Sequence, residues 1–126
     1  MNRKIIITAC VFGIIAVVAG AFGAHGLKNL IAASDLENWK TAVNYQFYHT
    51  LALLFLSAVT PKSRYINLSY YTLSLGIVMF SGSLYLLATR SITGIPVNIL
   101  GPITPLGGLM FILGWIFLLL AAIKNK

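Results

Sequence analysis

Long apolar segments alternate with short charged ones along the whole chain. Four stretches contain no Lys, Arg, Asp or Glu: residues 5–27, 41–61, 65–89 and 91–123. A membrane-spanning helix needs about 20 predominantly apolar residues, and a charged side chain at mid-membrane costs roughly 2.5–3.5 kcal/mol. The pattern therefore predicts an all-α, integral membrane four-helix bundle that forms a single transmembrane domain over residues 1–126. The four helices are expected at about 5–24, 35–60, 66–89 and 104–123.

The first apolar segment has a second interpretation, a cleaved signal peptide that ends near Ala24. The segment follows Arg3 and Lys4, as the apolar region of a signal peptide would. Such regions usually span about 7–15 residues, and this one is longer. Small residues also recur every three or four positions along it, which lets helices approach closely in lipid. We therefore expect it to be retained as the first transmembrane helix.

The second helix begins with a recognisable start signal and ends at a proline. Ser34 and Glu37 have the spacing of a capping box, in which each side chain satisfies a free amide of the first turn. Pro61 ends the segment, because proline cannot continue a helix. Trp39, Tyr45 and Tyr48 are interpreted as aromatic residues of the membrane interface. The polar first half would then lie near the headgroups and the apolar second half in the hydrocarbon.

The last helix is expected to follow a loop. Residues 91–104 contain two glycines and two prolines, which is typical of a loop. Because its other residues are largely apolar, we expect it to fold back on the bundle or to lie in the membrane interface. Pro105 suits a helix start, with Thr104 as the N-cap. Within the helix, Gly107 and Gly114 are seven residues apart, and so are Gly114 and Ala121, which predicts a seam of close packing.

Composition argues against a soluble domain and against a nucleic-acid-binding protein. Of the 126 residues, 59% are hydrophobic and only 9% are charged, whereas an average soluble domain has about 25% charged residues. The net charge of +7 comes from Lys and Arg residues scattered singly or in pairs at the ends of apolar segments. Such a distribution sets membrane topology. The single cysteine, Cys10, excludes an internal disulfide.

The positions of Lys and Arg also predict the orientation. The N-terminus, the turn at 61–66 and the C-terminus carry two each, six in total, while the connection at 25–40 and the late loop carry three. Cytoplasmic segments carry the excess of Lys and Arg. We therefore expect a multi-pass protein of the cell membrane with both the N- and C-termini in the cytoplasm.

This orientation gathers the unusual polar side chains in the outer half of the bundle. Polar groups that face lipid would be unsatisfied, so these side chains are expected to face one another. We interpret them as candidate ligand-binding residues. They are His25, Asn44, Gln46, His49, Ser81, Ser83, Tyr85 and Thr104.

Three interpretations of this cluster stay open. Its side chains could simply hold the helices together by hydrogen bonds worth roughly 0.6–1.7 kcal/mol each. They could form a binding pocket or a proton or ion path, in which His49 would carry a proton near neutral pH. His25 and His49 are also weak candidates for a metal or haem site, because they could lie on facing helices at similar depth.

Four segments together resemble one protein family. They are 20–27 (GAFGAHGL), 39–53 with its Trp-Lys-Thr-Ala, Tyr-Gln, His and Leu-Ala-Leu positions, 80–85 (FSGSLY), and 101–115 with its GPITPLGG and Gly-Trp positions. This combination is similar to domain of unknown function 423, small bacterial four-pass membrane proteins whose eukaryotic relative is called transmembrane protein 256. The resemblance spans nearly the whole chain. It implies an integral membrane protein of four helices and implies no activity.

The leading hypothesis is a non-enzymatic membrane protein whose outer polar cluster binds a small ligand or a partner helix. The alternatives are a small transporter or proton or ion channel, and a haem- or metal-binding redox subunit. Catalytic residues and a cofactor are not predicted, because no Ser stands with a His and an Asp in a recognisable arrangement. The expected partners are the lipid bilayer and either a second copy or another membrane protein, and not nucleic acid.

Overall fold

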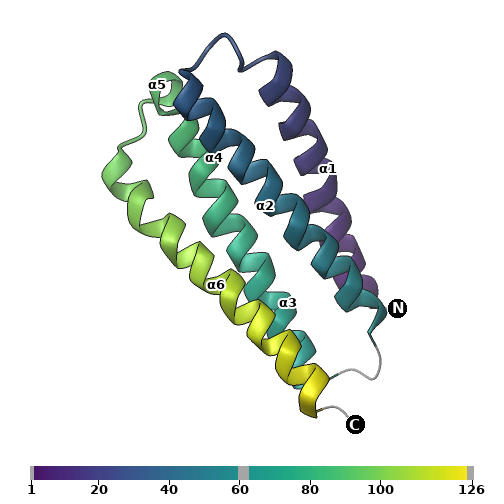
Figure 1. Cartoon of the computed structure of the whole chain (residues 1–126). Helices are drawn as coiled ribbons and strands as arrows, with labels where there is room; N and C mark the ends of the chain where they lie inside the picture. Colours follow the sequence, from purple (N-terminus) through teal and green to yellow (C-terminus); the bar gives the residue numbers. More distant parts are fainter. Residues whose placement is uncertain (1, 60–62, 125–126) are drawn as a thin grey trace.

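The computed structural model describes residues 2–59 and 63–124, and every regular element in these ranges is helical (Figure 1). The elements are α1 (Arg3–His25), α2 (Ala33–Ala58), α3 (Arg64–Gly76), the π-helical segment η1 (Ile77–Ser81), α4 (Gly82–Ala88), the short α5 (Arg90–Thr93) and α6 (Val97–Lys124). Because α3, η1 and α4 follow one another without a break, they form one continuous rod.

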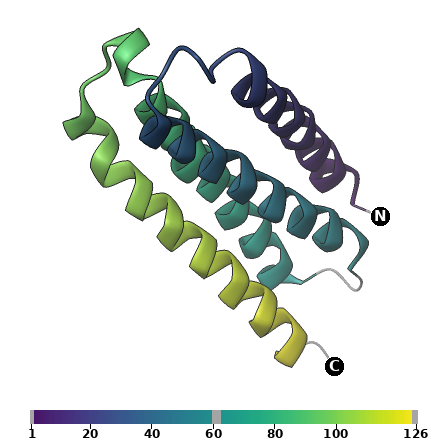
Figure 2. The ribbon, with the colours of Figure 1, turned by 45° about the horizontal axis from the view of Figure 1, so that its top comes forward.

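The long helices lie side by side (Figures 1 and 2). The helix α2 contacts α1 on one side and η1 and α4 on the other, and α6 packs mainly along α3 and η1. The Arg3 end of α1 and the Lys124 end of α6 lie at the same end of the molecule (Figure 1). We call this the terminal end, and the end with the α1–α2 connection and α5 the loop end.

Three helical segments of the described chain are long and apolar enough to span a membrane: Arg3–His25, Arg64–Ala88 and Val97–Lys124. The helix α2 is not among them, although it has 26 residues. Its first two thirds carry polar side chains, including Asn44, Gln46 and His49, which lower its hydropathy.

The core toward the terminal end consists almost entirely of hydrocarbon. Leu53 and Leu56 of α2 meet Leu73 of α3 there, and each of these side chains is at most 1% exposed. The seam predicted on the last helix is confirmed as a set of buried positions, Gly107, Gly114 and Ala121. At Gly114, a Cβ atom would lie 2.5 Å from Cγ of Leu73, so a larger residue there would force the Leu73 side chain or one of the two helices to shift.

The predicted capping box of the second helix is wrong. The helix α2 begins at Ala33, and its N-cap, Ala32, makes no side-chain capping bond. The capping box of Ser34 with Glu37 is therefore not formed. Asp35 accepts a hydrogen bond from Arg90 across the loop end instead, and this contact anchors the first turn. At the other end, α2 stops at Ala58 with Val59 in an extended conformation, while Pro61 and the predicted last residue, 60, lie outside the described residues.

The predicted loop before the last helix is also largely wrong. The helix α6 begins at Val97, seven residues before the expected start, with Pro102 and Pro105 inside it. Proline is tolerated in membrane helices because neighbouring helices and hydroxyl side chains satisfy the freed backbone groups. Thr104 is therefore not an N-cap but a residue of the α6 interior, where its hydroxyl meets that of Ser83.

What remains of the predicted loop is short and does not fold back on the helices. Arg90–Thr93 forms the single turn α5, and Gly94 follows with φ 72°, a left-handed conformation that favours glycine. Ile92 of α5 is exposed, and so are Val97 and Ile99 in the first turn of α6. The expected position of this segment in the membrane interface stays a prediction.

Candidate functional site

Gln46 joins three helices through its buried amide group. Its Nε2 donates to the carbonyl oxygen of Phe12 in α1 at 2.8 Å, and its Oε1 accepts from the hydroxyl of Tyr85 in α4 at 2.6 Å. The side chain is only 2% exposed. Because a buried amide without partners is costly, the two bonds fix the positions of α1, α2 and α4 relative to one another.

Two further contacts join neighbouring helices through serine hydroxyls. Ser81, which is fully buried, donates to the carbonyl oxygen of Ala42 at 2.7 Å. The hydroxyls of Ser83 and Thr104 lie 2.6 Å apart and so tie α4 to α6. Ser81 is the last residue of η1, in which Gly82 N–H reaches back five residues to Ile77. Such π-bulges occur often at functional sites.

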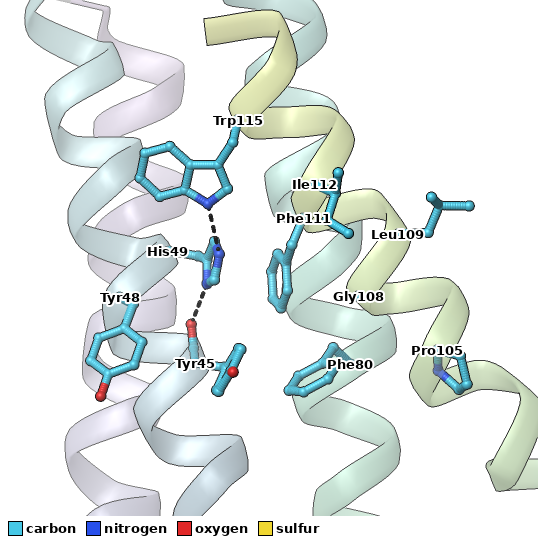
Figure 3. Close-up of a pocket in the computed structure, with 10 residues that line it drawn as sticks. All are labelled: Tyr45, Tyr48, His49, Phe80, Pro105, Gly108, Leu109, Phe111, Ile112 and Trp115. Carbon is cyan, nitrogen blue, oxygen red and sulfur yellow. Dashed lines mark hydrogen bonds between the residues drawn. The ribbon is translucent and has the colours of Figure 1, made fainter. Parts of the chain in front are cut away.

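His49 is held between α2 and α6 by both of its ring nitrogens (Figure 3). Nδ1 lies 2.7 Å from the carbonyl oxygen of Tyr45, and the indole Nε1–H of Trp115 donates to Nε2 at 3.1 Å. A carbonyl can only accept and an indole can only donate. The partners therefore fix a neutral imidazole with its proton on Nδ1. The ring also stacks on Phe111 with centroids 3.6 Å apart and planes inclined by 9°.

Two of the sequence-predicted site residues lie apart from these contacts. His25 is the exposed last residue of α1. Asn44 is exposed as well, and lines a small hollow of about 210 Å³ beside Trp39. The other six predicted residues take part in hydrogen bonds between or within helices, but these bonds form separate pairs. The six residues do not surround one common cavity. Separate pairs of this kind are expected where polar groups hold helices together.

A groove opens between α2 and α6, and its floor is formed by η1 (Figure 3). Its volume is about 790 Å³, and the lining side chains are aromatic or aliphatic with no charged group among them. Of the predicted site residues, only His49 lines it. The full lining is Tyr45, Tyr48, His49, Phe80, Pro105, Gly108, Leu109, Phe111, Ile112 and Trp115.

Sequence reasoning missed most of this groove because its walls look like ordinary membrane-helix residues. Trp115 gave the one usable signal. An indole N–H near the middle of an apolar helix needs an acceptor, and His49 is a polar residue at a comparable position of another helix. Tyr45 and Tyr48 were predicted at the membrane interface. They lie near the middle of α2, beside the groove.

The structure gives no support to a two-histidine metal centre. Both ring nitrogens of His49 are engaged in hydrogen bonds, and His25 is exposed at the end of α1. Within residues 2–59 and 63–124, no group of three or more His, Cys, Asp or Glu residues could hold a metal ion.

An ion pair at the loop end was also missed. Arg90 donates to a carboxylate oxygen of Asp35 at 2.7 Å and, from the same nitrogen, to the carbonyl oxygen of Leu87 at 2.9 Å. The Asp35 side chain is 8% exposed and that of Arg90 is 39% exposed. Arg90 is the first residue of α5, and it joins the first turn of α2, through Asp35, to the last turn of α4, through Leu87. The two helices are therefore held together at the loop end.

Comparison with known proteins identifies the family. Residues 19–108 match the family described as "Protein of unknown function (DUF423)". The chain belongs to this family. Its relatives include the UPF0382 membrane protein YwdK of Bacillus subtilis, 42% identical over 97% of this chain and 98% of that protein. The UPF0382 inner membrane protein YgdD of Escherichia coli is 38% identical over 99% of this chain and 93% of that protein. A UPF0382 membrane protein of Staphylococcus haemolyticus is 42% identical, with 97% of each chain covered.

These relatives are UPF0382 membrane proteins, so this chain is a membrane protein of the same family. Its three long apolar helical segments agree with this assignment. The matched range includes the α2 wall of the groove, Phe80 of its floor and Gly108 of α6, whereas Phe111 and Trp115 lie beyond it. No solved structure matches the chain.

Proposed function

We propose that this UPF0382 protein crosses the cell membrane four times, with both termini in the cytoplasm, and binds a small apolar ligand in the groove between α2 and α6. The proposal is that of a non-enzymatic binding protein. The observation that carries it is the groove itself, a hollow with an aromatic lining that neither α2 nor α6 fills.

The geometry of α2 supports a fourth crossing. Its 26 residues correspond to a length of about 39 Å at 1.5 Å per residue, enough to span a hydrocarbon core of about 30 Å. Gln46 and His49, which lower its hydropathy, are buried against neighbouring helices, while Leu51, Leu54 and Phe55 are exposed. From Leu51 to Ala58, the side chains that would meet lipid in a four-helix bundle are therefore all apolar.

The charges support cytoplasmic termini. Arg3, Lys4, Arg64 and Lys124 lie at the terminal end, and the sequence adds Lys62 and Lys126, which lie outside the described residues. At the loop end, both acidic residues of the chain pair with cations, Asp35 with Arg90 and Glu37 with Lys40. An excess of Lys and Arg marks the cytoplasmic side, and here it falls at the terminal end.

The groove has the size and lining of a ligand site. Small-molecule sites usually enclose about 300–1,000 Å³ and are lined mainly by apolar and aromatic side chains, and this groove has a volume of about 790 Å³. It opens on the outer surface of the helices, so a ligand dissolved in the membrane could enter sideways. Its few polar ring atoms, on His49 and Trp115, already bond each other.

The alternatives find less support. A transport path would have to cross the core of Ile5, Leu53, Leu56, Leu73 and their neighbours, which fills the interior toward the terminal end with hydrocarbon. A haem- or metal-binding subunit would need ligands with free lone pairs, and both nitrogens of His49 are already engaged.

The test is native mass spectrometry of the gently extracted protein and of two glycine variants of α6. Gly108 lines the groove, and a Cβ atom there would lie 3.8 Å from the Phe80 ring, so Gly108→Leu should fold and fill the groove. Gly101→Leu is the matched control, because Gly101 is exposed, has no neighbour within 4 Å of a Cβ position and does not line the groove.

We expect a bound small molecule in the wild type and in Gly101→Leu, and its loss in Gly108→Leu. A wild type without a bound molecule, or equal retention in both variants, would overturn the proposal. A second copy of the chain that leaves only in Gly108→Leu would also overturn it, because the occupant would then be a partner helix.

A further inference from the structure

Two tyrosines at the groove, Tyr45 and Tyr48, carry hydroxyl groups that have no hydrogen-bond partner among the described residues. Neither Tyr45 nor Tyr48 makes a side-chain hydrogen bond within residues 2–59 and 63–124, although both residues lie at the groove (Figure 3). Tyr45 is twelve residues after Ala33, the start of α2, which places it about 18 Å along a helix of about 39 Å. If α2 crosses the membrane as proposed above, both residues lie close to mid-membrane.

At that depth, ordinary lipid cannot satisfy a phenol hydroxyl. The hydrocarbon core is about 30 Å thick and contains no water to accept a hydrogen bond. The ester oxygens and headgroups of phospholipids lie at its edges, and an acyl chain carries no acceptor at its centre. A molecule that pairs with these hydroxyls must therefore bring an acceptor oxygen into the middle of the bilayer.

The rest of the lining indicates a neutral, flat molecule. No charged side chain lines the groove, so an ionised ligand would be buried without a counter-charge. The wall is a layer of rings in mutual contact: Tyr45 lies 4.7 Å from Phe80, and Phe80 lies 5.4 Å from Phe111, measured between centroids. Aromatic faces favour offset stacking on another ring.

We propose that the groove binds the ring of an isoprenoid quinone or a closely similar neutral compound, with its carbonyl oxygens accepting hydrogen bonds from Tyr45 and Tyr48. The inference rests on the proposed function and names the ligand class for the same groove. The isoprenoid tail leaves through the open side into lipid. The proposed role is to bind the quinone, without electron transfer.

Quenching of tryptophan fluorescence tests this inference, because quinones quench a nearby indole and the chain has only two tryptophans. Trp115 lines the groove, whereas Trp39 packs against Phe22 and Tyr85 on another side of α2. Decylubiquinone is titrated into full-length Trp39→Phe protein in phosphatidylcholine nanodiscs, which reports Trp115 alone. Trp115→Phe, which reports Trp39 alone, is the matched control, and the melting of each variant by circular dichroism checks that it is folded.

We expect saturable quenching of Trp115 and only the linear, collisional quenching of Trp39. Adding Tyr45→Phe and Tyr48→Phe to the Trp39→Phe protein should raise the half-saturating concentration at least about fivefold, because the hydrogen bonds to the carbonyls are lost. Adding Gly108→Leu should abolish saturation.

Linear quenching of Trp115, or saturation that the two Tyr→Phe changes leave unaltered, would overturn the quinone inference. Displacement of the quinone by an equal concentration of oleate would overturn it too, because the groove would then accept any chain. In each of these cases, a bound molecule that is lost in Gly108→Leu during native mass spectrometry would leave the proposed function standing. If that molecule were absent as well, both would fail.

Discussion

Gly107 and Gly108 are adjacent on α6, yet a methyl group should have opposite consequences at the two positions. At Gly107, an added Cβ atom would lie 2.7 Å from Cα and 2.8 Å from Cβ of Phe80. At Gly108, the nearest atom is on the Phe80 ring at 3.8 Å, an ordinary contact distance. The first glycine therefore permits backbone contact between α6 and η1, and the second faces the groove.

Comparing Gly107→Ala with Gly108→Ala separates the cost of overpacking from the effect of helix propensity. Replacing glycine by alanine inside a helix gains up to about 1 kcal/mol from helix propensity, and this gain is common to both variants. Only Gly107→Ala adds an overpacked contact, which typically costs about 1–3 kcal/mol. Because the clash is with backbone, the two helices must move apart, and no side chain can relieve it by changing rotamer. Gly107→Ala should therefore be about 1–3 kcal/mol less stable than Gly108→Ala.

The measurement is reversible unfolding in mixed detergent micelles with increasing dodecyl sulfate, followed by far-ultraviolet circular dichroism. Gly108→Ala should match or slightly exceed the wild type, and Gly107→Ala should unfold at a lower detergent fraction. Equal free energies of unfolding for the two variants would refute the close contact of α6 with η1, and with it the position of the groove floor.

Two other substitutions test the polar contacts by the same unfolding assay. Gln46→Leu removes both hydrogen bonds and leaves the partly buried Tyr85 hydroxyl without its acceptor, so the free energy of unfolding should fall by about 1–3 kcal/mol. Asn44→Leu, at an exposed site on the same helix, should cost nothing, and equal losses in the two variants would contradict the bridging role of Gln46. Asp35→Asn should lower the free energy of unfolding by less than about 1 kcal/mol, because Arg90 is partly exposed and solvent screens the ion pair. This loss should shrink with added salt. Glu37→Gln, which removes an exposed pair at 3.7 Å, should have no effect.

The extent of each helix could be predicted where local sequence decides it. Charge-free windows of about 20 residues predicted helices whose bounds are close to those of α1 and of the rod of α3, η1 and α4. Local sequence suffices there because the exclusion of charge from hydrocarbon acts on each segment separately. The start of α6 could not be predicted in this way. Gly101, Pro102 and Pro105 are typical of loops in water, but α6 includes them because neighbouring groups satisfy the backbone in a packed membrane helix.

The candidate site could be predicted only as a set of polar residues. Sequence position indicated that Gln46, Ser83 and Tyr85 would turn inward, because lipid cannot satisfy them. Which residue meets which depends on the rotation of each helix about its axis. That rotation changes at η1, whose additional backbone step shifts the faces before and after it. The His49–Trp115 bond and the groove between α2 and α6 follow from this packing and leave no periodic signal in the sequence.

Cysteine labelling in intact cells tests directly whether α2 crosses the membrane as a fourth helix. In a Cys10→Ala background, a single cysteine replaces either Leu30, in the exposed α1–α2 connection, or Ser63, at the start of α3. A membrane-impermeant maleimide should label the cysteine at 30 in intact cells, and the cysteine at 63 only after permeabilisation. Labelling of both positions from the same side would mean that α2 does not cross the membrane and would contradict the account.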